Sequence, residues 1–328
     1  MELPTLEEIE SAAHVVYAGM PATPQYRWPL LCEEAGTEVW LKHENHTPVG
    51  AFKVRGGLAY FAGLAASGSC AAVVTATRGN HGQSVARCAA RHGMAATVVV
   101  PHGNSVEKNA AMRALGATVV EHGGDFQEAR EFAGQLAARQ GLHYVPSFHR
   151  TLVAGVATAG LELFRAVPGI DTIYVPIGLG SGICGAVAAR DALGLAVKVV
   201  GVVSAHARAY AASFGARRPI ESPVTTALAD GLACRTPEPE ALEIICRSVD
   251  RIVEVTDAEI AESIRVLFQC THNCAEGAGA AAYAAIRKEK SQLAGRKVAA
   301  MLTGANIDRG IFAAALAGDG QGVRTDAF

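Results

Sequence analysis

A lone lysine, Lys53, stands beside an aromatic residue in the stretch Ala51-Phe52-Lys53-Val54-Arg55-Gly56. Burial in apolar surroundings disfavours the ammonium form of a lysine and lowers its pKa, which makes the amine a nucleophile toward an aldehyde. Schiff-base chemistry is therefore the first hypothesis for this stretch. The alternative is an ordinary surface lysine at the start of a helix.

A second polar stretch, Thr75-Ala76-Thr77-Arg78-Gly79-Asn80-His81-Gly82-Gln83, follows a predicted strand and leads into a predicted helix over Ser84–His92. A turn of this kind presents backbone N–H groups and the positive end of the helix dipole to an anion. A simple helix cap by Thr77 or Asn80 would explain the same residues.

A third stretch, Val175-Pro176-Ile177-Gly178-Leu179-Gly180-Ser181-Gly182-Ile183-Cys184-Gly185, has the composition of a phosphate-binding loop. Its second half also satisfies the dinucleotide pattern G-x-G-x-x-G. A dinucleotide fold needs an acidic residue at the end of the following strand, but Lys198–Val203 ends in Ser204-Ala205-His206. A nicotinamide-dependent dehydrogenase is therefore a distant alternative.

A fourth stretch, Met301-Leu302-Thr303-Gly304-Ala305-Asn306, follows the last predicted strand. Together the four stretches resemble, in order and over nearly the whole chain, the pyridoxal-phosphate enzymes of the tryptophan-synthase-β-like fold (fold type II), specifically the threonine/serine dehydratase branch. That family writes S-F-K-x-R-G, S-x-G-N-H, a glycine-rich loop after V-P, and S-G-G-N. This chain has A-F-K-V-R-G, T-R-G-N-H, G-L-G-S and T-G-A-N.

The resemblance implies pyridoxal 5'-phosphate as the cofactor and Lys53 as the catalytic residue, which would form the Schiff base and later take the Cα proton. Phe52 would lie beside the cofactor, and Glu276 would lie behind its ring. Glu276 matches the family's E-P-x-G stretch, with glycine in place of the proline. The other implied cofactor contacts are the pyridine 3-oxygen with Asn80, the pyridine nitrogen with Thr303, and the phosphate with Gly178, Leu179, Gly180 and Ser181.

The resemblance also implies a substrate site, in which Thr77, Asn80 and His81 would hold the carboxylate of an amino acid. The reaction would be the elimination of water from a β-hydroxy-α-amino acid, giving a 2-oxo acid and ammonia. The full set of expected substrate-binding residues is Thr77, Arg78, Gly79, Asn80, His81, Ser147 and Phe148.

Two of these residues depart from the family pattern. Arg78 stands where racemases carry a serine and simple dehydratases usually an alanine. A guanidinium stays protonated and cannot act as the second acid–base group of a racemase, but it can pair with a carboxylate or stack on a ring. Phe148 stands where relatives have a polar side chain. We therefore expect elimination without racemisation and a bulky substrate such as 3-phenylserine.

Three alternatives stay open at this point: a 3-hydroxyaspartate dehydratase, an amino-acid racemase of the same fold, and a plain threonine/serine dehydratase in which Arg78 and Phe148 point away from the cleft. No metal site is expected. Many relatives bind a divalent cation through a Glu and an Asp just after the strand equivalent to Lys198–Val203, where this chain has neither carboxylate. Activity should therefore be insensitive to EDTA. Cys270 and Cys274 have no second matching pair for a zinc site and are expected in core and turn.

Composition limits the partners. The formal net charge is −2 and 18% of the 328 residues are charged, which argues against binding to nucleic acid or to an anionic membrane. No apolar run approaches the roughly 20 residues of a membrane helix. Eight scattered cysteines without C-x-x-C, and no signal peptide, predict a cytoplasmic protein with reduced thiols. The expected partners are a small amino-acid substrate and a second copy in a homodimer.

The elements that must position these residues follow from the alternation of β-branched runs with longer Ala/Leu/Glu/Arg segments. This pattern predicts an α/β fold with two lobes, each an open, mostly parallel sheet flanked by helices, and the cofactor in the cleft between them. Residues 68–148 are expected to form a small mobile domain carrying the carboxylate loop, and residues 1–67 and 149–328 the large cofactor-binding domain. Little chain follows Thr303, so no C-terminal regulatory domain is expected.

Several helix ends are marked in the sequence. A capping box of Thr256 and Glu259 opens a helix through Phe268, and Gly93 and Gly116 end two others. The predicted strands are Val39–Lys42, Ala72–Thr75, Ala96–Val100, Thr118–Glu121, Tyr144–Val145, Thr172–Val175, Lys198–Val203, Arg251–Val255 and Lys297–Leu302.

Overall fold

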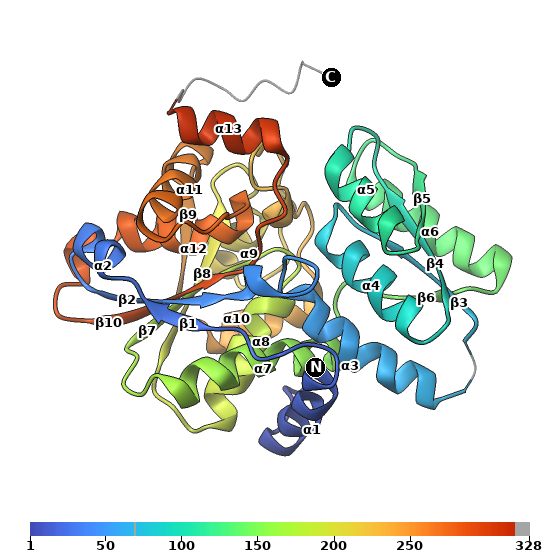
Figure 1. Cartoon of the computed structure of the whole chain (residues 1–328), viewed down its shortest axis with the longest axis horizontal. Coiled ribbons are helices and arrows are strands. Elements are labelled where there is room, and N and C mark those ends of the chain that lie inside the picture. The colour runs from blue at the N-terminus through green and yellow to red at the C-terminus, as the bar shows by residue number, and fades with distance from the viewer. Residues whose placement is uncertain (69, 319–328) are drawn as a thin grey trace.

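Both faces of the predicted strands are apolar, which a parallel sheet requires when helices cover it on both sides. In the computed structural model, which describes residues 1–68 and 70–318, the strands form two separate sheets with helices on their faces (Figure 1). The predicted α/β fold with two mostly parallel sheets is confirmed. The larger sheet has, in spatial order, the strands β1 (Gln25–Arg27), β2 (Glu38–His43), β10 (Lys297–Leu302), β7 (Thr172–Pro176), β8 (Lys198–Ser204) and β9 (Arg251–Val255).

The larger sheet is parallel except at one edge, where β1 pairs with β2 in antiparallel sense. The sequence does not predict β1, because its three residues Gln-Tyr-Arg lack β-branched side chains and are too few to show a period. The last strand of the chain, β10, lies in the middle of this sheet, between β2 and β7.

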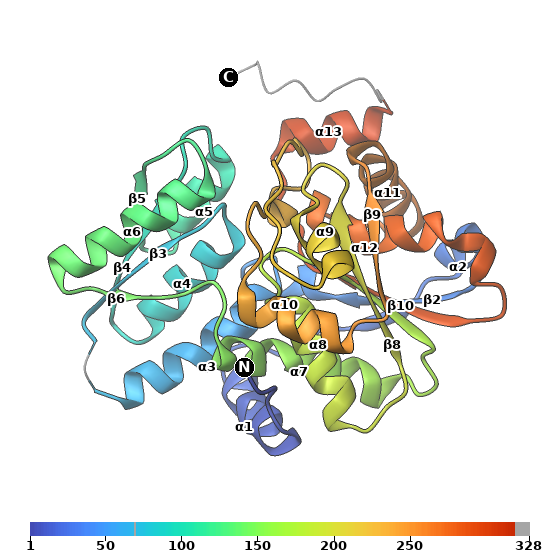
Figure 2. The same cartoon turned by 180° about the vertical axis from the view of Figure 1, so that it is seen from behind.

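Helices cover both faces of the larger sheet (Figures 1 and 2). Alternate strand residues face two different cores, since Tyr174 and Val200 belong to one hydrophobic cluster and Ile173 and Val199 to the other. The helices of this lobe are α1 (Leu6–Tyr17), α2 (Pro29–Ala35), α7 (Arg150–Ala166), α8 (Ser181–Ala192), α9 (Ala209–Ala216), α10 (Pro239–Ser248), α11 (Asp257–Thr271), α12 (Gly277–Lys288) and α13 (Arg309–Ala317).

The smaller sheet is parallel throughout and lies to one side of the larger lobe (Figure 1). All four strands were expected, and each has its ends within one residue of the prediction. In spatial order they are β5 (Thr118–Glu121), β4 (Ala95–Val100), β3 (Ala72–Ala76) and β6 (His143–Tyr144).

One helix belongs to both lobes. Its residues Val54, Leu58 and Phe61 are fully or almost fully buried in the hydrophobic core of the smaller sheet, although the helix starts at the edge of the larger one. Figure 1 shows it running beneath the gap between the lobes. This helix is α3 (Lys53–Ala66), and the helices that pack with it around the smaller sheet are α4 (Asn80–Arg91), α5 (Val106–Ala114) and α6 (Phe126–Gln140).

The predicted helix signals hold where they can be checked. The Thr256 hydroxyl accepts a hydrogen bond from the Glu259 N–H and the Glu259 carboxylate accepts one from the Thr256 N–H, so the capping box is present. The helix runs to Thr271, beyond the predicted end. Gly93 and Gly116 follow the ends of α4 and α5 with φ of 68° and 92°. This left-handed conformation favours glycine.

Candidate active site

Lys53 is the first residue of α3, directly after the loop that leaves β2. Its Nζ donates a hydrogen bond to the hydroxyl of Ser181 at 2.9 Å and lies 5.0 Å from the centre of the Phe52 ring. Burial lowers the pKa of the Lys53 amine from 10.5 to about 8. This surrounding agrees with the predicted desolvated lysine, whose role as the reactive amine stays a prediction.

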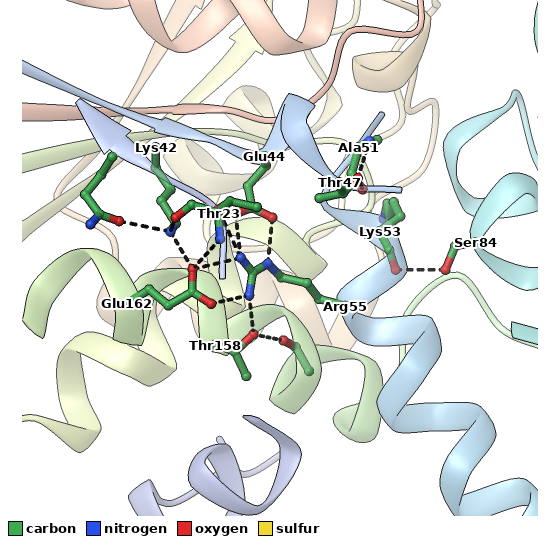
Figure 3. A network of polar contacts seen from close by, with 12 residues as sticks. Thr23, Lys42, Glu44, Thr47, Ala51, Lys53, Arg55, Ser84, Thr158 and Glu162 are labelled. Carbon is green, nitrogen blue, oxygen red and sulfur yellow. Dashed lines mark hydrogen bonds and ion pairs between the residues drawn. The ribbon is translucent and has the colours of Figure 1, made fainter. Parts of the chain in front are cut away.

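A buried network of charges anchors the start of α3 (Figure 3). The Arg55 guanidinium donates to the Glu44 carboxylate at 2.7 and 2.9 Å and to Glu162 on α7 at 2.6 Å, and Arg55 and Glu44 are wholly inaccessible to solvent. Burial alone would lower the pKa of Arg55, but the two carboxylates raise it well above its ordinary value. Arg55 therefore ties α3 to the loop after β2 and to α7, two residues from Lys53.

A cavity opens between the lobes around Lys53. Every site residue predicted from the sequence lines it except Phe148. The predicted residues on its wall are Phe52, Lys53, Thr77, Arg78, Gly79, Asn80, His81, Ser147, Gly178, Leu179, Gly180, Ser181, Glu276 and Thr303.

The polar loop before α4 forms one wall of this cavity. The Thr77 hydroxyl accepts hydrogen bonds from the N–H groups of Gly79 and Gly82, at 2.9 and 3.2 Å. Gly79 has φ of 154°, and α4 starts at Asn80, four residues earlier than the sequence predicts. N–H groups in the first turn of a helix have no acceptor within the helix, so this end of α4 is open to an anion.

His81 adds an unpaired ring nitrogen to the same wall. Its Nε2 is buried without a hydrogen-bond partner, and the side chain is 7% exposed. Burial and the nearby Lys53 charge lower the pKa of His81 to about 3, so the imidazole is neutral at physiological pH. A neutral ring in a cavity can donate to or accept from a ligand, depending on its tautomer.

The glycine loop forms the opposite wall. Gly180 caps α8 with φ of 103°, and a Cβ on Gly178 would come within 2.4 Å of the Gly231 carbonyl oxygen. Neither position accepts a larger residue without a backbone shift. The loop therefore brings the backbone N–H end of α8 next to Ser181, which already accepts the hydrogen bond from Lys53.

The fourth predicted stretch lies against the lysine stretch. The Phe52 N–H donates to the Thr303 carbonyl oxygen at 3.0 Å, and Ala51 and Gly304 form a β-bridge. Thr303 thus enters the cavity beside Phe52. Glu276 joins the same group, because its N–H donates to the Gly304 carbonyl oxygen.

An ion cluster that the sequence did not reveal joins the two lobes at the cavity. Lys108 on α5 donates to Asp230 at 2.6 Å and to Glu276 at 3.2 Å. Burial raises the pKa of Glu276 above its ordinary value, although the Lys108 ammonium opposes this shift. The Asn80 side-chain amide also donates to Glu276, and the Asn80 Oδ1 accepts a hydrogen bond from the Asn306 side-chain amide at 2.8 Å. Single charged residues in a helix and a short turn carry no signal in the sequence that could have identified them.

Phe148 is the one predicted site residue that the structure places elsewhere. It is 8% exposed and belongs to the hydrophobic cluster that also contains Val153 and Val175. Burial of a phenylalanine side chain is favourable by about 1.5–3 kcal/mol, which explains its place in the core. A second aromatic residue besides Phe52 lines the cavity: Phe126, at the start of α6, which the sequence did not single out.

Comparison with known proteins decides the family. The model of the family described as pyridoxal-phosphate dependent enzyme matches residues 17–304. The chain is 35% identical over 305 residues to the L-threonine ammonia-lyase of Thermotoga maritima, covering 93% of this chain and 76% of that protein. The chain belongs to the pyridoxal-phosphate-dependent threonine/serine dehydratase family. It is also 31% identical over 296 residues to the biosynthetic L-threonine dehydratase of Escherichia coli, covering 89% of this chain and 58% of that longer protein.

Solved structures of this fold agree. Threonine deaminase isoform 2 of Solanum lycopersicum superposes with a TM-score of 0.87 at 26% identity, covering 96% of this chain and 94% of that one. A pyridoxal 5'-phosphate-dependent aspartate racemase superposes with a TM-score of 0.87 at 27% identity, covering 94% and 98%. The fold-type-II architecture is thereby confirmed, and the two sequence relatives described above are an ammonia-lyase and a dehydratase.

The cavity fits the cofactor of this family. Pyridoxal phosphate requires an amine for its aldehyde and donors for its phosphate, and the cavity offers the low-pKa amine of Lys53 beside the open N-terminus of α8. The rival interpretation of the glycine loop as a dinucleotide site gains no support, because Lys53 contacts the loop through Ser181.

No metal cluster is found within residues 1–68 and 70–318, since no three His, Cys, Asp or Glu side chains gather there in a way that could hold an ion. Independence from divalent cations stays a prediction. All eight cysteines are free thiols, and Cys270 and Cys274 lie in the last turn of α11 and just after it. No helix in the described part of the chain is long and apolar enough to cross a membrane.

Proposed function

We propose that this protein is a dehydratase that eliminates water from a β-hydroxy-α-amino acid of the threonine/serine type and releases a 2-oxo acid and ammonia. The observation that carries the proposal is the Lys53 amine, which has a pKa of about 8 and faces Ser181 inside a cavity with two open helix N-termini. The names of the sequence relatives, L-threonine ammonia-lyase and L-threonine dehydratase, support the same reaction.

The residues divide the work. Pyridoxal phosphate supplies electron withdrawal that acidifies the Cα–H of a bound amino acid. Lys53 is placed to carry this proton, because burial lowers the pKa of its amine to about 8, close to neutral pH, and the amine has no acidic partner among the described residues. Gly178, Leu179, Gly180 and Ser181 would hold the cofactor phosphate, whereas Thr77, Asn80 and His81 would hold the substrate carboxylate.

Four residues would surround the cofactor ring. Phe52 would lie along it and Glu276 behind it, and Asn80 would approach the 3-oxygen. Thr303 would meet the ring nitrogen with a hydroxyl rather than a carboxylate. A hydroxyl does not hold that nitrogen protonated, which favours elimination over racemisation.

Fewer residues of the cavity bear on the substituent at the substrate's β-carbon than on the reaction itself. The proposal of a bulky substrate such as 3-phenylserine rested on Arg78 and Phe148, and Phe148 lies in the core. Arg78 and Phe126 line the cavity and support an enlarged β-substituent. We also propose that the enzyme works as a homodimer in the cytoplasm. Free thiols fit a reducing compartment, and exposed Tyr26 and Leu30 near the sheet edge offer apolar surface to a second copy.

The test is an assay of 2-oxo acid release from serine, threonine, 3-hydroxyaspartate and 3-phenylserine, with chiral analysis of the substrate that remains. Wild-type enzyme should release 2-oxo acid from at least one of them and leave the rest of that substrate optically pure. Borohydride should attach the cofactor covalently to Lys53, and Lys53→Ala should lose at least about a thousandfold in kcat. Racemised substrate without 2-oxo acid would identify a racemase instead.

A further inference from the structure

Arg78 brings a positive charge into the cavity that the protein does not balance. Its Nε is buried without a hydrogen-bond acceptor, and in the part of the chain that the structure describes it has no ion pair with an acidic side chain. A guanidinium stays charged at any ordinary pH. A buried N–H group without an acceptor is rare in folded proteins and points to a missing partner.

The other charged side chains of the cavity already have partners. Lys108 is paired with both Asp230 and Glu276, at 2.6 and 3.2 Å, so its charge is used within the protein. Lys53 is the amine of the reaction and donates to Ser181. The two carboxylates are shared with Lys108, and neither reaches Arg78. The missing partner of Arg78 is therefore an anion that enters with a ligand. The cofactor phosphate would be held by the glycine loop on the opposite wall of the cavity, so this anion comes with the substrate.

A substrate offers two possible anions to Arg78. Its α-carboxylate already has the open N-terminus of α4 and the unpaired ring nitrogen of His81, which do not need an arginine. A second anion would have to be carried by the β-carbon. We propose that Arg78 binds a carboxylate on the substrate's β-carbon, which makes 3-hydroxyaspartate the preferred substrate.

An aromatic β-substituent explains Arg78 less well. A ring could stack on the guanidinium or on Phe126, which also lines the cavity. A ring face, however, does not supply the oxygen acceptor that the buried Nε lacks. A carboxylate supplies two oxygens in the geometry of the guanidinium fork.

The reaction balances without an oxidant or reductant. Elimination breaks the Cα–H and Cβ–OH bonds and releases one water. The resulting enamine gains a proton at Cβ, and one water adds to the imine carbon as ammonia leaves. The net reaction converts 3-hydroxyaspartate to oxaloacetate and ammonia. The inference rests on the proposed dehydratase function.

The experiment measures kcat/KM of the holoenzyme for 3-hydroxyaspartate, threonine and 3-phenylserine in the wild type and in Arg78→Gln. The wild type should favour 3-hydroxyaspartate over threonine by about tenfold or more, as expected for a charge-assisted pair. In Arg78→Gln this ratio should fall by about tenfold or more, while kcat/KM for threonine changes less than about threefold. Inhibition by succinate, a dicarboxylate without an amino group, should weaken in parallel.

Arg113→Gln is the matched control, because Arg113 is an exposed arginine of the smaller lobe outside the cavity. It should leave every ratio unchanged, and both variants should keep the yellow colour of the bound cofactor. Three results would overturn the inference: an equal loss for all substrates in Arg78→Gln, a wild-type preference for 3-phenylserine, or turnover of threonine without turnover of 3-hydroxyaspartate. Absence of 2-oxo acid from every substrate would instead reject the proposed function.

Discussion

Lys53 has no acidic side chain to hold its proton among the residues that the structure describes, and its hydrogen-bond partner is a neutral hydroxyl. Desolvation is the cause of its pKa shift. The low pKa of the amine therefore depends on its burial in the cavity and on the absence of a counter-charge. A substitution that admits water at this point should raise the pKa toward its ordinary value.

Cofactor capture by the apoprotein should follow this pKa. Only the free amine attacks an aldehyde, and burial lowers the pKa from 10.5 to about 8, so the rate should rise through pH 8 and level off above it. The check is the growth of the yellow absorption band after mixing apoprotein with pyridoxal phosphate between pH 6 and 10. A midpoint near 10.5 would show that Lys53 is solvated in the apoprotein.

Phe148 should matter for stability and not for substrate choice. Phe148→Ala should lower the free energy of unfolding by about 3–5 kcal/mol, because it empties a buried site, and should leave the ratios of kcat/KM between substrates unchanged. Phe126→Ala is the matched change at the cavity wall. It should alter the ratios of kcat/KM between substrates and lower the free energy of unfolding less than Phe148→Ala does. Urea unfolding and substrate profiles of both variants provide the measurements. Altered substrate ratios in Phe148→Ala would contradict the placement of this ring.

At the scale of single residues, the motifs predicted which side chains meet, because each motif follows a strand of a parallel sheet and such ends gather on one side of it. The sequence could not show which way Phe148 faces, since a phenylalanine beside a site is equally compatible with the core. Lys108 and Asp230 escaped notice because their pairing spans the two lobes and leaves no local pattern.

Among the elements, α3 has the most demanding position, since it starts at the catalytic amine and ends in the core of the other lobe. Its first turn is fixed by Arg55 between Glu44 and Glu162, which Figure 3 shows on the side of the helix away from Ser84. The hydroxyl of Ser84 on α4 in turn donates to the Lys53 carbonyl oxygen at 2.9 Å.

Arg55→Met should lower the free energy of unfolding by about 3–5 kcal/mol, because it leaves the buried carboxylate of Glu44 without its cation, whereas Glu162 keeps Lys42. It should also reduce kcat, since the start of α3 is no longer held. The exposed pair of Arg165 and Glu10 provides a control, and Arg165→Met should cost less than about 1 kcal/mol. Chemical unfolding of both variants, together with kcat measured on the folded fraction, tests this prediction. Equal small losses would mean that the buried network does not anchor α3.

The strands were predictable because buried parallel strands are short β-branched runs with clear ends. β1 was not, because it is stabilised by pairing with β2 and by neighbouring aromatic side chains such as Tyr26 and Trp28 rather than by its own propensity. The start of α4 was placed too late because Gly79 and the Thr77 hydroxyl cap it together, and a glycine alone does not reveal its φ.

At the scale of the molecule, polar contacts link residues of the smaller lobe to the larger lobe. Besides the pair of Lys108 with Asp230, the Ser105 hydroxyl donates to Asp308, and the Arg309 N–H donates to Glu107 at 3.0 Å. We propose that residues 68–148 move as a small domain against residues 1–67 and 149–328, and that these contacts hold the closed form. The small domain shares its hydrophobic core with α3, which starts in the larger lobe, and this shared core keeps such a motion small.

Lys108→Met should loosen this closed form. Loss of the ammonium removes the links to Asp230 and Glu276, so hydrogen exchange of the α5 amides should become faster and KM should rise for all substrates by a similar factor. A uniform rise separates this effect from the selective effect expected for Arg78. Arg113→Gln on the same helix is the control. Unchanged exchange in α5 would show that Lys108 does not hold the lobes together.

The central position of β10 has a consequence for synthesis on the ribosome. The smaller sheet can form once residue 144 has emerged, but the larger sheet lacks its middle strand, and Phe52 lacks Thr303, until residue 303 has been translated. Lys53 therefore leaves the ribosome long before the strand that completes its site. Nascent chains arrested before β10 should leave no cofactor attached after borohydride treatment, whereas chains with β10 outside the exit tunnel should retain it. Cofactor capture would thus report that the larger sheet is complete.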